Sequence, residues 1–337
     1  MTTSIPPWRR TTTRTKRQRR WITNHHRGDF HFEKGERLPE RSGHLVKGAD
    51  RKLEEDYAGC VGKRVASLPA TLGSRPCGKS QSQGSRGHRR RCFRFSCAGK
   101  EGAPIPRELS DEEIREYIQD YATAAKNAIE AGFAGVELHG ANGYLIDQFL
   151  QDTSNKRTDK WGGSIENRAR FAIEVTKAVV DAIGSNKVGI RLSPFSTFQG
   201  MGMSDPIPQF TYLVSQLKKL QLSYVHFVDP RIDVRKEYEA TASLKPLVTA
   251  WGNTSPVLIA GGFTPEIANN TVDEEYKDHD VVVVFGKYYI SNPDLVFRLQ
   301  KGLPLADYNR STFYAAKKRE GYVDYPFSQE FAREKKL

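Results

Sequence analysis

The fold is decided by the stretch GVELHGANGY at residues 135–144, where a short apolar run ends directly in a glycine-flanked polar loop. A run of about five apolar and β-branched residues next to glycine is typical of a buried strand. Four more such runs follow, at residues 188–192, 224–228, 257–261 and 281–285, with helical patterns between them that are clearest at 167–183 and 210–220. Alternating strands and helices predict an α/β fold with parallel strands and right-handed crossovers.

A helix is predicted immediately before this stretch. Ser110 and Glu113 form a capping-box pattern, after which apolar residues recur at intervals of three and four until Gly132. Before residue 103 no window has a sustained helical or strand period. We therefore place a domain boundary there, with a poorly ordered basic segment at residues 1–102 and the folded domain at residues 103–337.

Charge separates the same two segments. The chain of 337 residues has a net charge of +12. Residues 1–100 hold 24 Lys and Arg against 8 Asp and Glu, a net charge of +16, whereas residues 101–337 hold 28 against 32, a net charge of −4. The basic clusters at residues 16–20 and 89–91 would suit nucleic-acid phosphates, but a solvated basic tail is the simpler interpretation, so nucleic acid is not the partner we expect.

Cysteine and hydropathy patterns narrow the class of protein further. All four cysteines lie in the basic segment, at Cys60, Cys77, Cys92 and Cys97, without the short paired spacing of a zinc site, so no metal is predicted. The sequence has no apolar run of the roughly 18 residues that a membrane-spanning helix needs. We expect a cytoplasmic protein with no membrane partner.

Polar side chains gather where the predicted strands end, which is the ligand-binding edge in both barrels and open parallel sheets. After the first strand, His139 and Asn142 lie three residues apart and can both donate hydrogen bonds to one carbonyl oxygen. Tyr144, on the same loop, can donate a proton. We favour this catalytic interpretation over a loop whose polar groups only satisfy its own backbone.

Arg191 and two glycine turns indicate where an anionic ligand binds. Arg191 lies near the end of an apolar strand, where its charge needs an anion or an electron-rich partner, although a structural salt bridge would also satisfy it. The last two strands end at Gly261-Gly262 and at Gly286-Lys287. Loops after the final two strands of an eight-stranded α/β barrel commonly bind phosphate, whereas tight turns into a helix are the alternative.

The folded domain resembles the old yellow enzymes, a family of FMN-dependent ene-reductases, and in particular their fungal members. The resemblance extends from about residue 103 to residue 337 and is carried by dense strings: residues 132–159, the segment WGGSIENR at 161–168, and ISNPDL at 290–295. It implies a (β/α)8 TIM barrel that binds FMN at the carboxyl ends of the strands. The five predicted strands then correspond to the fourth to eighth of the barrel.

The resemblance also implies roles for the residues at the strand ends. His139 and Asn142 would bind the carbonyl of an enone or enal, and Tyr144 would protonate its α-carbon. Arg191 would contact the flavin ring, and Tyr314 would lie near the substrate. The remaining FMN-binding residues, which hold mainly its phosphate, would be Gly261, Gly262, Phe285, Gly286 and Lys287. NADPH or NADH would reduce the flavin, and a homodimer is possible.

One departure from the family pattern limits this expectation. The first three barrel strands should precede residue 103, and no matching segment is found there. Residues 1–102 resemble instead a translation, in the wrong reading frame, of DNA that would encode the missing strands. We therefore expect the barrel to be incomplete. Two alternatives to an active reductase follow: an inactive family remnant, and a basic nucleic-acid-binding protein without catalysis.

Overall fold

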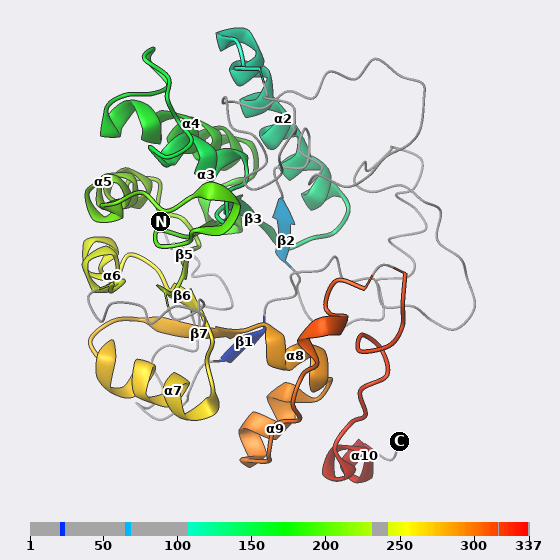
Figure 1. Ribbon diagram of the computed structural model, residues 1–337. Helices are drawn as coiled ribbons and strands as arrows, with labels where there is room; N and C mark the ends of the chain where they lie inside the picture. Colours follow the sequence, from blue (N-terminus) through cyan, green and yellow to red (C-terminus); the bar gives the residue numbers. More distant parts are fainter. Residues whose placement is uncertain (1–20, 24–64, 69–106, 231–241, 316, 336–337) are drawn as a thin grey trace, which may run out of the picture. The chain divides into compact units, whose positions relative to one another are not determined.

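The computed structural model describes residues 21–23, 65–68, 107–230, 242–315 and 317–335 (Figure 1). Its contacts divide the chain into two compact units. The larger unit comprises His25–Gly262 and Asp278–Val281, and the smaller comprises Met1–Asn24, Phe263–Lys277 and Val282–Leu337. The predictions for the four cysteines and for both basic clusters lie outside the described residues.

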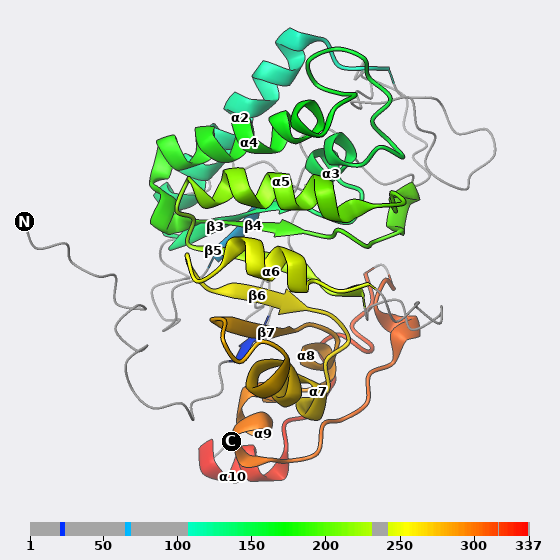
Figure 2. The same ribbon diagram turned by 90° about the vertical axis from the view of Figure 1, so that its left-hand side faces the viewer.

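The larger unit is a parallel sheet with helices packed along it. Its strands, in spatial order, are β2 (Val65–Leu68), β3 (Gly135–Gly140), β4 (Val188–Leu192), β5 (Tyr224–Val228) and β6 (Val257–Ala260). Its helices are α2 (Asp111–Glu130), α3 (Leu145–Leu150), α4 (Ile165–Ile183), α5 (Pro206–Lys218) and α6 (Lys245–Trp251). The helices α2, α4, α5 and α6 pack side by side in chain order, and Figure 2 shows α5 and α6 in front of the strands, with α2 and α4 above them.

The helix predicted before residue 132 and the one predicted at 167–183 form as α2 and α4, whereas the one predicted at 210–220 lies at Pro206–Lys218 as α5. Ser110 caps α2 as expected: its hydroxyl accepts the Glu113 backbone N–H at 3.3 Å, and the Glu113 carboxylate accepts the Ser110 N–H at 2.9 Å. Gly132, with φ +88°, follows the end of this helix. In α4 the Ser164 hydroxyl caps the first turn and Gly184 ends the helix. Local signals therefore fix both helix boundaries.

All five predicted strands are confirmed as β3 to β6 and β7 (Val281–Phe285). The structure adds two strands inside the basic segment that the sequence did not indicate. β2 pairs in parallel with β3, and β1 (Trp21–Thr23) pairs in parallel with β7. Three or four residues are too few to show a period, so these strands are defined by backbone pairing with longer neighbours.

The strand register puts a row of polar residues on one face of the sheet. Glu137 on β3 lies opposite Gly189 on β4, which lies opposite Tyr224 on β5. His139, Arg191 and His226 form the next row in the same register. Because side chains alternate along a strand, these two rows share one face, and the apolar residues between them share the other. The polar face carries the candidate site.

The smaller unit contains β1, β7 and a set of short helices. These are α7 (Pro265–Asn270), a π-helical turn (Thr271–Glu275), α8 (Lys287–Ser291), α9 (Leu295–Lys301) and α10 (Gln329–Lys335). Asp294 fixes the C-terminal segment, since its carboxylate accepts hydrogen bonds from the Arg298 side chain at 2.8 Å and the Ser328 backbone at 2.9 Å. Asn292 likewise bonds to both the N–H and the C=O of Ala306.

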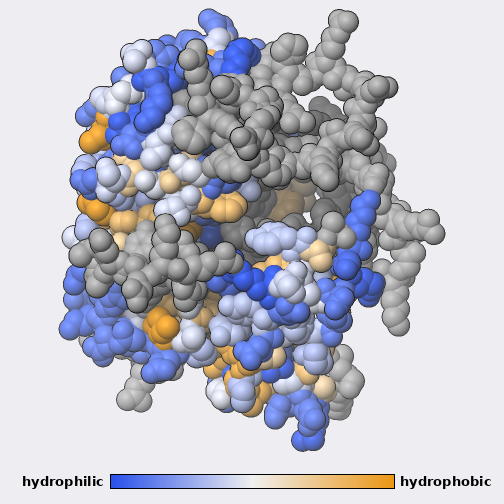
Figure 3. All heavy atoms as spheres, in the orientation of Figure 1, coloured by the Kyte–Doolittle hydropathy of each residue, from blue (hydrophilic) through white to orange (hydrophobic). Residues whose placement is uncertain are grey.

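On the face shown in Figure 3, hydrophobic residues form small separate groups among hydrophilic ones. The large hydrophobic side chains that are most exposed among the described residues are Tyr314, at 88%, and Phe198, at 61%. Within the described ranges, no helix is long and apolar enough to cross a membrane.

Candidate active site

The predicted catalytic residues begin at the carboxyl end of β3. His139 is 5% exposed, and burial, followed by the nearby charge of Arg191, lowers the pKa of its imidazole to about 4. The ring is therefore neutral near pH 7 and keeps one N–H to donate. The Tyr144 ring lies with its centroid 5.0 Å from that of His139. The structure thus brings two of the three predicted catalytic side chains together.

Asn142, the third, lies in the turn between them. Its backbone is left-handed, with φ +56°. Its N–H donates to the Ser193 hydroxyl at 2.7 Å, and its C=O accepts from the Gln199 side-chain amide at 2.8 Å. Tyr144 is half-buried at the start of α3. The turn is held on both sides of Asn142 by these two hydrogen bonds to its backbone.

Arg191 lies beside His139 in the sheet register and is 4% exposed. Among the described residues, its Nε and one of its terminal nitrogens, Nη1, have no hydrogen-bond partner. An arginine side chain keeps its charge in a protein, so unused buried donors call for an anionic or electron-rich group. The predicted alternative, a structural salt bridge, is not seen within the described ranges. The flavin ring, with its electron-rich edge, fits these donors.

Sequence reasoning missed a buried polar cluster on the same face. The Glu137 carboxylate accepts a hydrogen bond from the Tyr224 hydroxyl at 3.1 Å and from His226 Nδ1 at 2.9 Å. Burial lowers the pKa of His226, and the charge of Glu137 opposes that shift; Nδ1 is the ring nitrogen that donates to the Glu137 carboxylate. Gly189 makes room for this contact, because an added Cβ would lie 2.3 Å from the Tyr224 ring.

The charge of Glu137 is part of this cluster. Burial raises the pKa of the carboxyl, but the charge and the hydrogen bond of His226, followed by the charge of Arg191 and the hydrogen bond from Tyr224, outweigh it, so the pKa stays below its usual range. A fixed anion therefore lies near the guanidinium of Arg191 without occupying its free donors. Polar residues at alternate positions of two apolar strands were the sequence signal that could have revealed it.

The predicted phosphate-binding residues fall in both units. In the larger unit, Gly261 is packed so closely on Asp229 that an added Cβ would lie 2.6 Å from the Asp229 Cβ, and Gly262 is left-handed, with φ +57°. In the smaller unit, Gly286 precedes α8 and Lys287 opens it. Burial and the charge of Arg310 lower the pKa of Lys287. A joint phosphate site made by both pairs stays a prediction.

The other two predicted site residues also belong to the smaller unit. Phe285 ends β7 and is 2% exposed, so it contributes to the core of that unit. Tyr314 is exposed. Its predicted place near the substrate stays a prediction.

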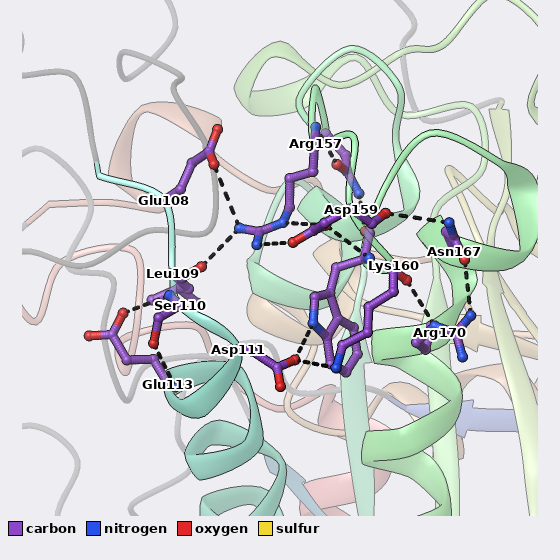
Figure 4. A network of polar contacts seen from close by, with 12 residues as sticks. Glu108, Leu109, Ser110, Asp111, Glu113, Arg157, Asp159, Lys160, Asn167 and Arg170 are labelled. Carbon is purple, nitrogen blue, oxygen red and sulfur yellow. Dashed lines mark hydrogen bonds and ion pairs between the residues drawn. The ribbon is translucent and has the colours of Figure 1, made fainter.

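The strings that carry the family resemblance have a structural role that Figure 4 shows. Arg157 donates to both carboxylate oxygens of Asp159, at 3.0 and 2.5 Å, and to the Leu109 C=O at 2.9 Å. The Trp161 indole donates to Asp111 at 2.7 Å. These bonds tie the loop before α4 to the start of α2. In this chain these residues therefore hold the loop in place next to α2.

Comparison with known proteins places this geometry in a family. The sequence profile of the NADH:flavin oxidoreductase / NADH oxidase family matches residues 84–306. The chain is 56% identical over 231 residues to the chanoclavine-I aldehyde reductase fgaOx3 of Penicillium roqueforti (strain FM164), covering 68% of this chain and 63% of that protein. It is 54% identical over 244 residues to the "Probable inactive reductase easA" of Epichloe festucae var. lolii, covering 70% and 64%.

A solved structure shows the same likeness. Morphinone reductase in complex with tetrahydroNAD superposes with a TM-score of 0.64 at 32% identity, covering 73% of this chain and 68% of that one. The chain belongs to the NADH:flavin oxidoreductase / NADH oxidase family, the old yellow enzymes, and the expected (β/α)8 barrel class is confirmed by this likeness.

The extent of the match is also informative. The chain spans less than two thirds of the length of these two curated relatives, 63% and 64%. The family match begins at residue 84, before the compositional boundary near residue 102, so that boundary stays a prediction.

Proposed function

We propose that the chain is an FMN-dependent reductase that takes electrons from NADPH or NADH and reduces the C=C bond of an enone or enal. The observation that carries the proposal is the neutral, buried His139 beside Tyr144, in register with an Arg191 whose buried donors are unused. Bound FMN would supply the hydride chemistry, accepting hydride from the nicotinamide and passing it to the β-carbon of the substrate.

The chain's own residues would bind and polarise the substrate. His139 and the Asn142 carboxamide donate hydrogen bonds to the carbonyl oxygen, which draws electron density from the conjugated double bond. A neutral imidazole suits this role because it donates without adding a buried charge. The Tyr144 hydroxyl then supplies the proton that the α-carbon gains.

Other residues would hold the cofactor. Arg191 would bind the flavin ring through Nε and Nη1, which have no partner within the described residues. Gly261 and Gly262 would let the phosphate approach the backbone, and Lys287 would add a positive charge. Relatives named as aldehyde reductases support a carbonyl substrate, and the tetrahydroNAD complex of morphinone reductase supports a nicotinamide donor.

A catalytically inactive family member is the second candidate. Relatives more than half identical to this chain are named as probable inactive reductases or dehydrogenases. The choice of nicotinamide, the cytoplasmic location, a homodimer and the absence of a nucleic-acid partner stay predictions.

Purification of the full chain with added FMN discriminates between these candidates. We expect a flavin absorption spectrum that bleaches on anaerobic addition of NADPH or NADH and returns when trans-2-hexenal is added. Replacing His139 by alanine should leave the flavin bound but slow the return. A colourless folded protein would refute FMN binding, and a flavin that the nucleotide bleaches but the enal does not reoxidise would favour the inactive candidate.

A further inference from the structure

The turn that carries Asn142 has an unusual backbone. Asn142 and Gly143 are consecutive left-handed residues, with φ +56° and +72°. Asn is one of the few residues with a Cβ atom that adopt this conformation readily, and its surroundings decide how firmly the turn is held. Gly143 tolerates it, and an added Cβ at that position would lie 2.7 Å from the Cβ of Gln199. The orientation of Asn142 therefore depends on what binds the turn.

A buried carboxyl group lies at the centre of the contacts that hold it. Asp147, which is fully buried in α3, accepts the Gly143 N–H at 2.8 Å. Its same oxygen accepts the Ser193 hydroxyl at 3.3 Å, and that hydroxyl accepts the Asn142 N–H at 2.7 Å. Asp147 thus reaches the peptide groups on both sides of Asn142, one directly and one through Ser193.

We propose that Asp147 is a positioning residue that fixes the Asn142–Gly143 turn and so aims the Asn142 side chain at the substrate carbonyl. The effect of Asp147 on the substrate rests on the proposed function, in which the Asn142 side chain binds the substrate carbonyl. The control of the turn by Asp147 rests on the hydrogen bonds alone.

When Asp147 is ionised, as at pH 8, both of its oxygens act as acceptors for the groups around it. Gly143 and Ser193 donate to one oxygen, and the Gln151 amide donates to the other at 3.2 Å. Gln151 is held in that orientation because its own oxygen accepts the Met203 backbone N–H at 3.1 Å. An Asp147→Asn substitution keeps the size of the side chain but replaces one acceptor oxygen by an NH2 group. That group then faces either the Gly143 and Ser193 donors or the Gln151 amide donor. The variant should therefore release the turn without opening a cavity.

Amide hydrogen exchange in the full chain without added flavin tests the structural half of the proposal. At pH 8, Asp147→Asn should speed exchange at Gly143 and at Asn142 by about tenfold or more, the factor that loss of one charge-assisted hydrogen bond predicts. Ser193→Ala, which leaves the carboxyl in place, should speed exchange at Asn142 more than at Gly143. Wild-type rates at both amides in Asp147→Asn would overturn the proposal.

A matched control separates positioning from general destabilisation. Thr176→Val removes another fully buried hydroxyl, one that donates to the Ala172 C=O at 2.7 Å within α4 and lies outside the turn. In this variant the amides of Asn142 and Gly143 should exchange at wild-type rates, even where amides of α4 exchange faster. If it accelerates them as much as Asp147→Asn does, the effect is general and the proposal fails.

The FMN-loaded chain tests the functional half. Asp147→Asn should raise the KM for trans-2-hexenal by about tenfold, while the rate of flavin bleaching by nicotinamide stays as in the wild type, because only carbonyl binding depends on the turn. Faster amide exchange with an unchanged KM would overturn the link to the substrate. A chain that binds no flavin refutes the proposed function instead, and the exchange data still decide whether Asp147 controls the turn.

Discussion

Replacing Gly189 by alanine puts a methyl group where the Tyr224 ring lies. The added Cβ would be 2.3, 2.4 and 2.7 Å from three atoms of that ring, which packs over Gly189 while its hydroxyl reaches Glu137 at 3.1 Å. The ring cannot stay in place, so the substitution both overpacks the interior and breaks a hydrogen bond to a buried carboxylate.

The expected cost follows from these two effects. Overpacking of a filled interior costs about 1–3 kcal/mol. A lost hydrogen bond to a charged group costs about 1.5–3 kcal/mol more. We expect Gly189→Ala to lower the free energy of unfolding by about 2.5–6 kcal/mol, a large share of the roughly 5–15 kcal/mol that is typical of a folded protein.

Urea unfolding followed by tryptophan fluorescence measures this loss. Tyr224→Phe isolates the hydrogen bond and should cost about half as much as Gly189→Ala. Gly132→Ala is the matched control, because Gly132 is left-handed at φ +88° with nothing within 4 Å of an added Cβ, so only backbone strain of about 1–2 kcal/mol is expected. A Gly189→Ala chain as stable as the Gly132→Ala chain would refute the packing of Tyr224 over Gly189.

Three further predictions follow from other contacts. Burial raises the pKa of Asp147 to about 7, above its unfolded value of 3.8, so the folded chain binds this proton more tightly than the unfolded chain does. The free energy of unfolding should therefore fall by up to about 4 kcal/mol as the pH rises from 4 to 7. An Asp147→Asn chain whose unfolding has the wild-type pH dependence would contradict this prediction. Trp161→Phe removes the 2.7 Å bond to Asp111 and should lower the unfolding free energy by about 1–2 kcal/mol, whereas an unchanged urea midpoint would show that the bond contributes nothing. Lys287→Ala should weaken FMN binding about tenfold in a fluorescence titration, and an unchanged affinity would remove Lys287 from the phosphate site.

The strands β3 to β7 and the loop that carries the proposed catalytic residues could be predicted from sequence because their signals are local. A strand such as β4 is marked by five consecutive residues, and the start of α2 by a cap and its partner three positions on. The same local logic placed His139, Asn142 and Tyr144 together, since a loop of six residues cannot separate them widely. The short β1 and β2 escaped notice because pairing with β7 and β3, and not an internal pattern, defines them.

The sequence alone therefore determined the α/β class, the five strands β3 to β7, the capped start of α2 and the family to which the chain belongs. Only the tertiary structure showed that Glu137 accepts bonds from Tyr224 and His226, which are 87 and 89 positions away, and that Asp147 is joined to Ser193, 46 positions away. Parallel strands joined by helices bring such distant residues into register. A hydrogen bond across that register depends on the packing of two whole βα units, so no local pattern in either segment encodes it.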